Sequence, residues 1–214
     1  MGERVVGTIN GDFYDTSTGA PLGILISGGE LISGIGGYYA VGFRADGSAV
    51  MGDPQLDMAV SRLSGGESME ISSMNKGRPE GGGIALLTDD YRTDHTTGVS
   101  TQGVSALCTV LGGRPAIGGT LDLRVDRVAE GAQPVAMGED QVVLTVADAG
   151  SAGALAFLRE LTAGESLRLT FSAAPGWETV TEAMGALHLL VKDGAPQTGF
   201  EASYAPPHRH RPAI

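Results

Sequence analysis

The sequence predicts an α+β fold: a single domain built around a mixed, largely antiparallel sheet with few helices. Short apolar stretches bounded by Gly, Asp and Pro recur along the chain, as expected for strands joined by turns. Helical periodicity occurs only late, so regular helices do not separate the strands. Glycine contributes 34 of the 214 residues, which indicates many tight turns and close approaches of the backbone.

The apolar stretches are predicted as strands, and one of them shows which face is buried. Leu167, Leu169 and Phe171 alternate with Arg168 and Thr170, which is typical of a strand with one buried and one solvated face. We therefore place that strand at the periphery of the sheet. The predicted strands cover residues 5–9, 39–43, 84–88, 104–111, 142–146, 167–171 and 187–191.

The clearest helix is expected over residues 151–162, where Leu155, Leu158 and Leu161 recur at helical spacing. Ser151 can cap its first turn and Gly164 can close its end. A second, shorter helix is expected over 178–184. No repeat or linker divides the chain, so we assign residues 1–204 to one domain and 205–214, with its prolines, to an irregular tail.

Charge and hydropathy exclude two classes of interaction. The formal net charge of −11 and the sequence pI near 4.7 would repel a phosphate backbone, so no nucleic-acid partner is expected. No apolar run reaches the roughly 18 residues that a membrane-spanning helix needs. The N-terminus also lacks the basic and apolar segments of a signal peptide, and we expect no transmembrane segment.

No cofactor or metal site is predicted. Cys108 is the only cysteine and lies inside an apolar stretch, which favours core packing over a reactive thiol. His208 and His210 have the spacing of a two-residue chelate, but they lie in the tail without a nearby cysteine or acidic ligand. A solvated tail is the simpler interpretation.

A polar turn near the N-terminus carries the first candidate site, in the run Ile9-Asn10-Gly11-Asp12-Phe13. Asp12 would project where the predicted strand ends, and strand ends are where rigid scaffolds place reactive groups. Asn-Gly-Asp is equally a common hairpin turn. The run by itself does not decide between the two.

Further motifs follow this run in a fixed order. They are Gly19-Ala20-Pro21-Leu22-Gly23, Val41 to Gly52, Ile71 to Arg78, Leu86 to Tyr91 and Leu189 to Gly194. In that order and at these spacings the chain resembles the phosphodiester glycosidase family, which includes N-acetylglucosamine-1-phosphodiester alpha-N-acetylglucosaminidase and bacterial exopolysaccharide-biosynthesis-type members. The resemblance covers nearly the whole chain, although each motif is weak singly.

The resemblance implies hydrolysis of a sugar-1-phosphodiester at the glycosidic C1–O bond, releasing a free sugar such as N-acetylglucosamine. An oxocarbenium-like transition state requires a nearby carboxylate, and the departing phosphate requires cationic or amide donors. The partner would be a phosphorylated glycan, and the location extracellular or at a bacterial cell surface. The alternative is a non-catalytic module that binds a cell-wall or exopolysaccharide glycan; a third interpretation is a structural part of a surface protein.

Two residues carry the expected chemistry. Asp12 is the candidate carboxylate, as nucleophile or as base for water, with Asn10 and the Gly11 amide on sugar hydroxyls or phosphate oxygens. Arg78, with Asn75, could clamp the phosphate, because a guanidinium matches phosphate oxygens bidentately. The alternative for Arg78 is a surface arginine paired with an acid such as Glu80.

The remaining candidates rest on the family resemblance. Thr97 could line the site, although ordinary loop structure is the simpler explanation. Lys192 and Asp193 match a family motif, although a plain turn would explain them too. Arg211 resembles the start of the family's Arg-Thr-Ala-Ile/Val-Gly segment, with Pro212 in the threonine position.

The family's later Leu-Asp-Gly-Gly-Gly-Ser signature does not occur before Ile214. We therefore expect a C-terminally incomplete domain that holds part of a two-carboxylate site, with weak or absent activity. Missing strands would leave sheet edges or apolar faces uncovered, and such surfaces favour self-association.

Overall fold

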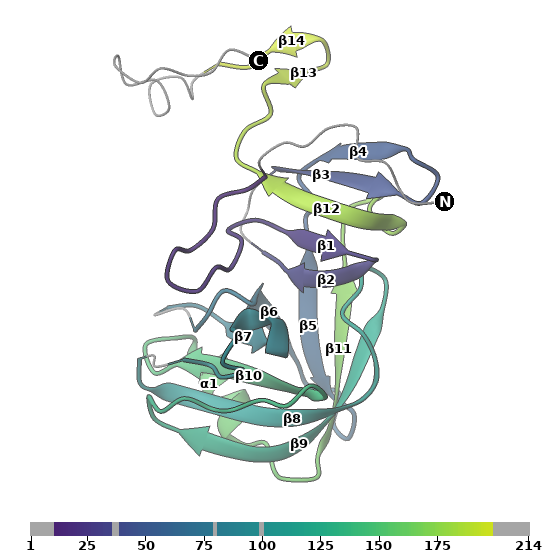
Figure 1. Cartoon of the computed structure of the whole chain (residues 1–214). Helices are drawn as coiled ribbons and strands as arrows, with labels where there is room; N and C mark the ends of the chain where they lie inside the picture. The colour runs from purple at the N-terminus through teal and green to yellow at the C-terminus, as the bar shows by residue number, and fades with distance from the viewer. Residues whose placement is uncertain (1–10, 36–38, 79–80, 99–100, 199–214) are drawn as a thin grey trace.

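The computed structural model describes residues 11–35, 39–78, 81–98 and 101–198, and within them the fold is mostly β. Seven strands close into a barrel, five form an open sheet, and a two-stranded hairpin follows (Figure 1). These residues contain a single α-helix. The expected α+β fold is therefore wrong, because strands dominate over the one helix, half of them close into a barrel, and a segment expected to be helical pairs as a strand.

The barrel strands satisfy one another's backbone groups by closing in a ring, and closure removes the open edges of a sheet. Every neighbouring pair is antiparallel except β6 and β7, which run parallel. The order around the barrel is β10-β7-β6-β5-β11-β9-β8. The strands are β5 (Asp57–Arg62), β6 (Ser68–Met74), β7 (Ile84–Leu87), β8 (Gly103–Gly113), β9 (Thr120–Glu130), β10 (Gln141–Ala147) and β11 (Ser166–Ser172).

An antiparallel five-stranded sheet lies across one end of the barrel (Figure 1). Its order is β2-β1-β12-β3-β4, so the late strand β12 lies between early ones. The hairpin of β13 and β14 projects beyond this sheet (Figure 1). The strands are β1 (Leu25–Ser27), β2 (Glu30–Ser33), β3 (Tyr39–Arg44), β4 (Ala49–Gly52), β12 (Val180–Ala186), β13 (Val191–Lys192) and β14 (Ala195–Pro196).

One cluster of buried apolar side chains runs from the barrel into the sheet. Leu144 and Leu169 of the barrel belong to the same cluster as Ile26 and Leu31 of the sheet. A backbone bridge between Gly34 and Met74 also joins the two layers. Barrel and sheet therefore share a core, as expected for one folding unit.

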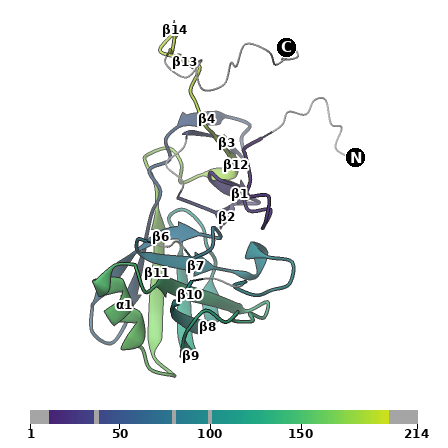
Figure 2. The same cartoon turned by 90° about the vertical axis from the view of Figure 1, so that its left-hand side faces the viewer.

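The helix α1 (Ala152–Arg159) confirms the predicted helix, with shorter bounds. It lies against the outside of the barrel (Figure 2), where it contacts β8 and β10 and buries Leu155, Phe157 and Leu158. Ser151 is the N-cap residue, but its side chain makes no capping hydrogen bond. Besides α1, residues Asp89–Tyr91 form a short 3-10 helix.

The strand predictions have mixed outcomes. Strands cover the predicted segments 39–43, 104–111, 142–146 and 167–171, and all of 84–88 except Thr88. The predicted strand 5–9 and the 205–214 tail lie outside the described residues. Residues 187–190 form no strand, since β12 ends at Ala186. The predicted helix at 178–184 is wrong because this segment pairs between β1 and β3.

β11 shows the predicted alternation of buried and exposed residues. Its place at the periphery is wrong, however, because it pairs with both β5 and β9 within the barrel. The solvated face is thus the outside of the barrel. Cys108 is buried as expected, and burial raises the pKa of its thiol to about 12.

Candidate functional site

The carboxylate of Asp12 is held by two backbone N–H groups at the junction of the N-terminal segment with the sheet. Oδ1 accepts a hydrogen bond from the N–H of Phe13 at 2.7 Å. Oδ2 accepts one from the N–H of Gly23, just before β1. The side chain is half-buried, so the carboxylate is fixed in place while still reachable from solvent.

Two glycines allow this carboxylate to lie against the backbone. A Cβ atom added at Gly23 or at Gly185 of β12 would lie 2.5 Å from Oδ2 of Asp12. The two Cα atoms also approach each other closely, since each added Cβ would lie 2.8 Å from the other residue's Cα. The absence of side chains at both positions is therefore what makes room for Asp12.

The cation near Asp12 is Lys76, which follows β6. Its ammonium donates to the carbonyls of Pro21, Leu22 and Gly23 at 2.8, 2.7 and 2.9 Å. Burial lowers the pKa of Lys76 to about 8, while the negative charge of Asp12 opposes this shift. Lys76 is not among the site residues predicted from the sequence, although it lies in the same motif as Asn75 and Arg78.

Asp12 lies where two clefts adjoin, each of about 250 Å³. Gly11, Phe13 and Met184 line both clefts together with Asp12. The aromatic rings of Phe13 and Tyr14 are 55% and 61% exposed. One carboxylate in mostly apolar walls, with exposed aromatic rings beside it, suits a ligand that has both polar groups and C–H faces. The cleft beyond β12 continues along Val41, Ala186 and Leu187.

Asn75 is buried and its side chain is fully occupied within the protein. Nδ2 donates to the Ile32 carbonyl at 2.7 Å and to Oγ1 of Thr88 at 2.8 Å. Oδ1 accepts from the N–H of Thr88 at 2.8 Å. The side chain thus ties β2 to the end of β7, and a ligand contact would require it to give up these bonds.

Arg78 is also held by protein groups. Its guanidinium donates to Oγ1 of Thr145 at 2.7 Å, to Oγ of Ser105 at 2.7 Å and to the Gly131 carbonyl at 3.1 Å. A further bond goes to the Thr101 carbonyl, and burial lowers the pKa of Arg78. None of these partners is shared with Asp12, so the structure does not join the two residues into one network; Glu80 lies outside the described residues.

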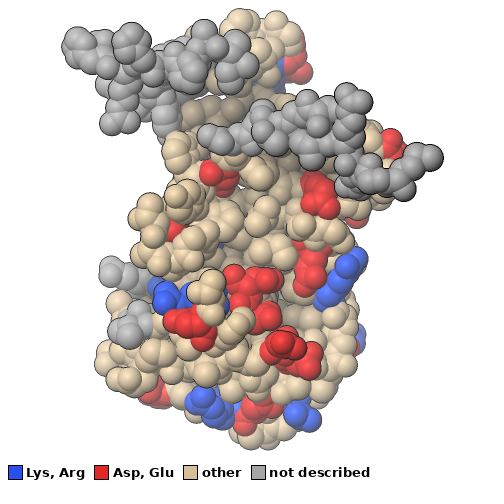
Figure 3. Space-filling view, in the orientation of Figure 1, with Lys and Arg blue, Asp and Glu red and all other residues tan. Residues whose placement is uncertain are grey.

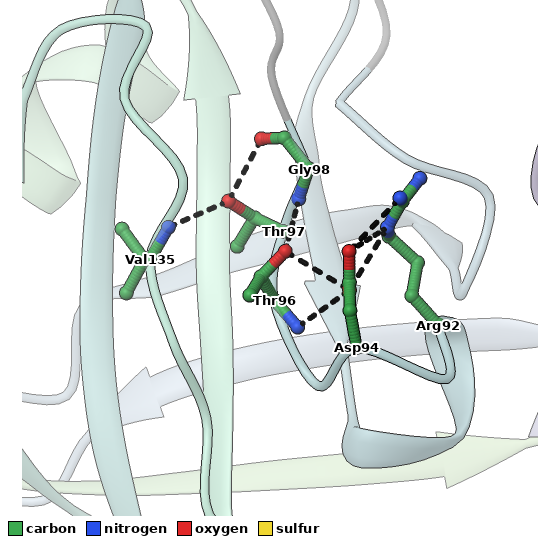
Figure 4. A network of polar contacts seen from close by, with 6 residues as sticks. All are labelled: Arg92, Asp94, Thr96, Thr97, Gly98 and Val135. Atoms are coloured by element: carbon green, nitrogen blue, oxygen red, sulfur yellow. Dashed lines mark hydrogen bonds and ion pairs between the residues drawn. The ribbon is translucent and has the colours of Figure 1, made fainter.

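Thr97 belongs to a network of loop contacts (Figure 4), and among the described residues its hydrogen-bond partners do not include Asp12. Its Oγ1 accepts from the N–H of Val135 at 2.9 Å and donates to the Gly98 carbonyl at 3.3 Å. Beside it, Arg92 pairs with Asp94 at 3.0 Å. The hydrogen bonds from Arg92 and Thr96 lower the pKa of Asp94 to about 2. These contacts order the loop itself.

The other predicted site residues lie at the margins of the described chain. Lys192 and Asp193 are exposed in the β13–β14 hairpin. Asp193 and Gly194 have φ values of 52° and 76°, the left-handed pair that a two-residue hairpin turn requires. Gly11 lies next to Met184 of β12, whereas Asn10 and Arg211 fall outside the described residues.

Acidic side chains gather over the middle of one face of the molecule (Figure 3). A cleft of about 180 Å³ contains several acidic residues and Arg114. The acidic residues that line it are Glu30, Asp89, Asp90, Glu139 and Asp140.

Within the described parts of the chain, no group of three or more His, Cys, Asp or Glu residues is arranged to hold a metal ion. No helix there is long and apolar enough to cross a membrane.

Two solved structures are among those that share this fold. One is described as "a hypothetical protein from Synechocystis" and matches with a TM-score of 0.66 and 18% identity over 89% of this chain. The other, a "putative exported protein" from Burkholderia pseudomallei K96243, matches with a TM-score of 0.61 and 13% identity over 87% of this chain. This chain spans 33% and 42% of their respective lengths. At these identities the likeness shows the fold alone.

No family model matches the chain, and no curated protein matches it.

Proposed function

We propose that this chain hydrolyses a sugar-1-phosphodiester at the glycosidic C1–O bond, with Asp12 as the catalytic carboxylate. The observation that carries the proposal is the place of Asp12, held by two backbone N–H groups where two clefts adjoin. In the reaction the C1–O bond breaks, the oxygen leaves with the phosphate, and a water oxygen becomes bonded to C1. The proton that water loses passes to Asp12 or to the phosphate.

Each element of the site has a role in this chemistry. The Asp12 carboxylate stabilises the positive charge that develops at C1, and its fixed position removes the cost of reorientation during the reaction. The exposed rings of Phe13 and Tyr14 offer flat apolar surfaces to the C–H face of a sugar. A phosphate clamp by Arg78 would require the guanidinium to exchange its present hydrogen bonds, and the same holds for Asn75.

One observation favours a second function, glycan binding without turnover. Both oxygens of Asp12 already accept backbone hydrogen bonds, which reduces their freedom to attack C1 or to activate water. A carboxylate in that state still accepts hydrogen bonds from sugar hydroxyls. The same clefts would then hold a cell-wall or exopolysaccharide glycan.

We place this activity outside the cell or at a bacterial cell surface. One of the matched structures is described as that of a "putative exported protein", which supports this location. The match covers less than half of that protein, so the location is a proposal for this chain.

The decisive experiment measures free-sugar release and binding with a sugar-1-(4-nitrophenyl phosphate), comparing wild type with Asp12→Asn. Hydrolysis predicts release that falls about 100-fold or more in Asp12→Asn. The matched control is Asp46→Asn in the β3–β4 turn, which keeps an oxygen to accept from the Ser48 N–H and should leave release unchanged.

Saturable binding without release would support the glycan-binding function instead. Neither release nor binding, or equal release by wild type and Asp12→Asn, would refute the Asp12 site.

A further inference from the structure

The carbonyls of three consecutive residues turn toward one ammonium. In an extended strand successive carbonyls point to opposite sides. At Pro21, Leu22 and Gly23 the chain bends instead, and all three carbonyl oxygens lie within 2.9 Å of Nζ of Lys76. Such convergence of partial negative charges is stable only around a donor, and here Lys76 supplies it.

The base of Lys76 is rigid. The preceding residue, Asn75, and the following one, Gly77, both have left-handed backbone conformations, with φ values of 53° and 79°. The side-chain bonds of Asn75 to Ile32 and Thr88 anchor this stretch to β2 and β7. Nζ also donates to Oγ of buried Ser33 at 3.1 Å. The ammonium therefore has a fixed position relative to the sheet.

Gly23 connects this cation to the candidate carboxylate. Its carbonyl accepts from Lys76 at 2.9 Å, and its N–H donates to Oδ2 of Asp12. One residue thus bonds to both charged groups from its two peptide units. Without the ammonium the bend at 21–23 would lose the donor that its carbonyls share, and the Gly23 N–H would lose its fixed direction.

We propose that Lys76 is a positioning residue of the Asp12 site: it holds the backbone of residues 21–23 so that the Gly23 N–H fixes the Asp12 carboxylate. The positioning is a property of the fold, and its effect on turnover or affinity rests on the proposed function. Lys76 itself need not touch a ligand, since its ammonium is already occupied by the carbonyls and by Ser33.

This arrangement makes the site sensitive to alkaline pH. With its pKa lowered to about 8 by burial, Lys76 loses its charge and one of three N–H donors in mildly alkaline solution. The groups that face it are the three carbonyls, the Ser33 hydroxyl and, through its charge, Asp12. Among these groups Asp12 carries the charge, and its negative charge opposes the lowering of the pKa of Lys76.

As the pH rises, the contribution of Lys76 to global stability and its hold on residues 21–23 should change in opposite directions. The folded-state pKa lies below the ordinary value of 10.5, so between about pH 8 and 10.5 the unfolded chain binds the extra proton. The contribution of Lys76 to stability therefore rises with pH in this window. Its hold on residues 21–23 weakens in the same window, because the neutral amine is the poorer donor.

The test records the amide resonance of Gly23 by NMR in wild type, Lys76→Met, Lys76→Arg and Asp12→Asn. Asp12→Asn defines the position of this amide proton without the carboxylate bond. In Lys76→Met the Gly23 amide proton should move upfield, most of the way to its chemical shift in Asp12→Asn. In Lys76→Arg it should move upfield by less. In wild type the resonance should move the same way with an apparent pKa of about 8, and Lys76→Arg should show no step there.

Arg168→Met, on the exposed outside of the barrel, is the control and should leave Gly23 unchanged. A Gly23 amide that responds neither to Lys76→Met nor to pH would overturn the proposal, even if Asp12→Asn abolishes sugar release. If the amide responds while wild type neither binds nor cleaves the substrate, the positioning stands and the proposed function fails. Should Lys76→Met not fold, the wild-type titration and Lys76→Arg give the same decision.

Discussion

At position 75 the backbone has a left-handed conformation and the side chain is buried with three hydrogen bonds to Ile32 and Thr88. Asparagine adopts positive φ more readily than most residues, and its amide offers donors and an acceptor together. Asn75 therefore combines two requirements that no aliphatic side chain meets. Its role in the fold explains its presence without any contact to a ligand.

Replacing Asn75 separates the two contributions. Asn75→Gly keeps the backbone relaxed but leaves the Ile32 carbonyl and the Thr88 N–H without these partners, and we expect a loss of about 2 kcal/mol in the free energy of unfolding. Asn75→Ala should lose about 1 kcal/mol more, because alanine is strained at positive φ. Urea unfolding of both variants measures this difference. Equal stability of the two would contradict the strain, and wild-type stability of Asn75→Gly would contradict the hydrogen bonds.

Among the elements, β12 shows most clearly how tertiary structure overrides local preference. The segment Val180–Ala186 contains Glu182, Ala183 and Met184, which favour helices, and periodicity over so short a stretch does not oppose that assignment. In the fold it lies between β1 and β3, which satisfy its backbone on both sides. The pairing partners are about 140 or more residues away in the chain, so local sequence could not reveal them.

Arg78 links two strands of the barrel. Its guanidinium donates to Ser105 of β8 and to Thr145 of β10. Arg78→Lys should lose about 2 kcal/mol in the free energy of unfolding, since an ammonium cannot reproduce the guanidinium's directed bonds. Arg168→Lys, on the barrel exterior beside Asp122, is the matched control and should leave stability nearly unchanged. Chemical unfolding and substrate binding are measured on both variants.

A different outcome would restore the phosphate-clamp hypothesis. If Arg78→Lys keeps wild-type stability but binds the sugar-1-phosphodiester much more weakly, the guanidinium contacts the ligand. The four protein groups now bonded to it would then be the partners it leaves on binding.

For the whole molecule, the outer face of the five-stranded sheet is an exposed apolar surface. Met51, Val41, Met184 and Leu25 are successive partners across β4, β3, β12 and β1, so their side chains lie in one row. Met51 is 65% exposed, and Phe43 beside this row is also exposed. The row itself contains no charged residue, and exposed Glu182 lies beside it, opposite Phe43. The expectation of self-association therefore has a definite surface. It overlaps the clefts beside Asp12, because Leu25, Val41 and Met184 also line them.

We expect a second copy of the chain to pack against this row, giving a mass that rises with concentration in sedimentation velocity. Met51→Lys should weaken the association tenfold or more, about 1.4 kcal/mol, because a charge would be buried at the contact. Thr170→Lys adds the same charge on the exposed outside of the barrel and should leave association unchanged. A wild-type chain that stays monomeric at every concentration would contradict the expectation.

The sequence by itself determined the strands with a clear apolar run, such as those around residues 84–88 and 104–111, and the helix near 152–159, because their signals are local. It also made Asp12 a candidate, through a polar turn together with the ordered motifs of the family resemblance. Only the tertiary structure decided that the barrel closes and that Lys76, Gly23 and Gly185 surround Asp12. The physical reason is that closing the barrel and bringing these residues to Asp12 both depend on hydrogen bonds between segments far apart in the chain. No local sequence pattern encodes such bonds.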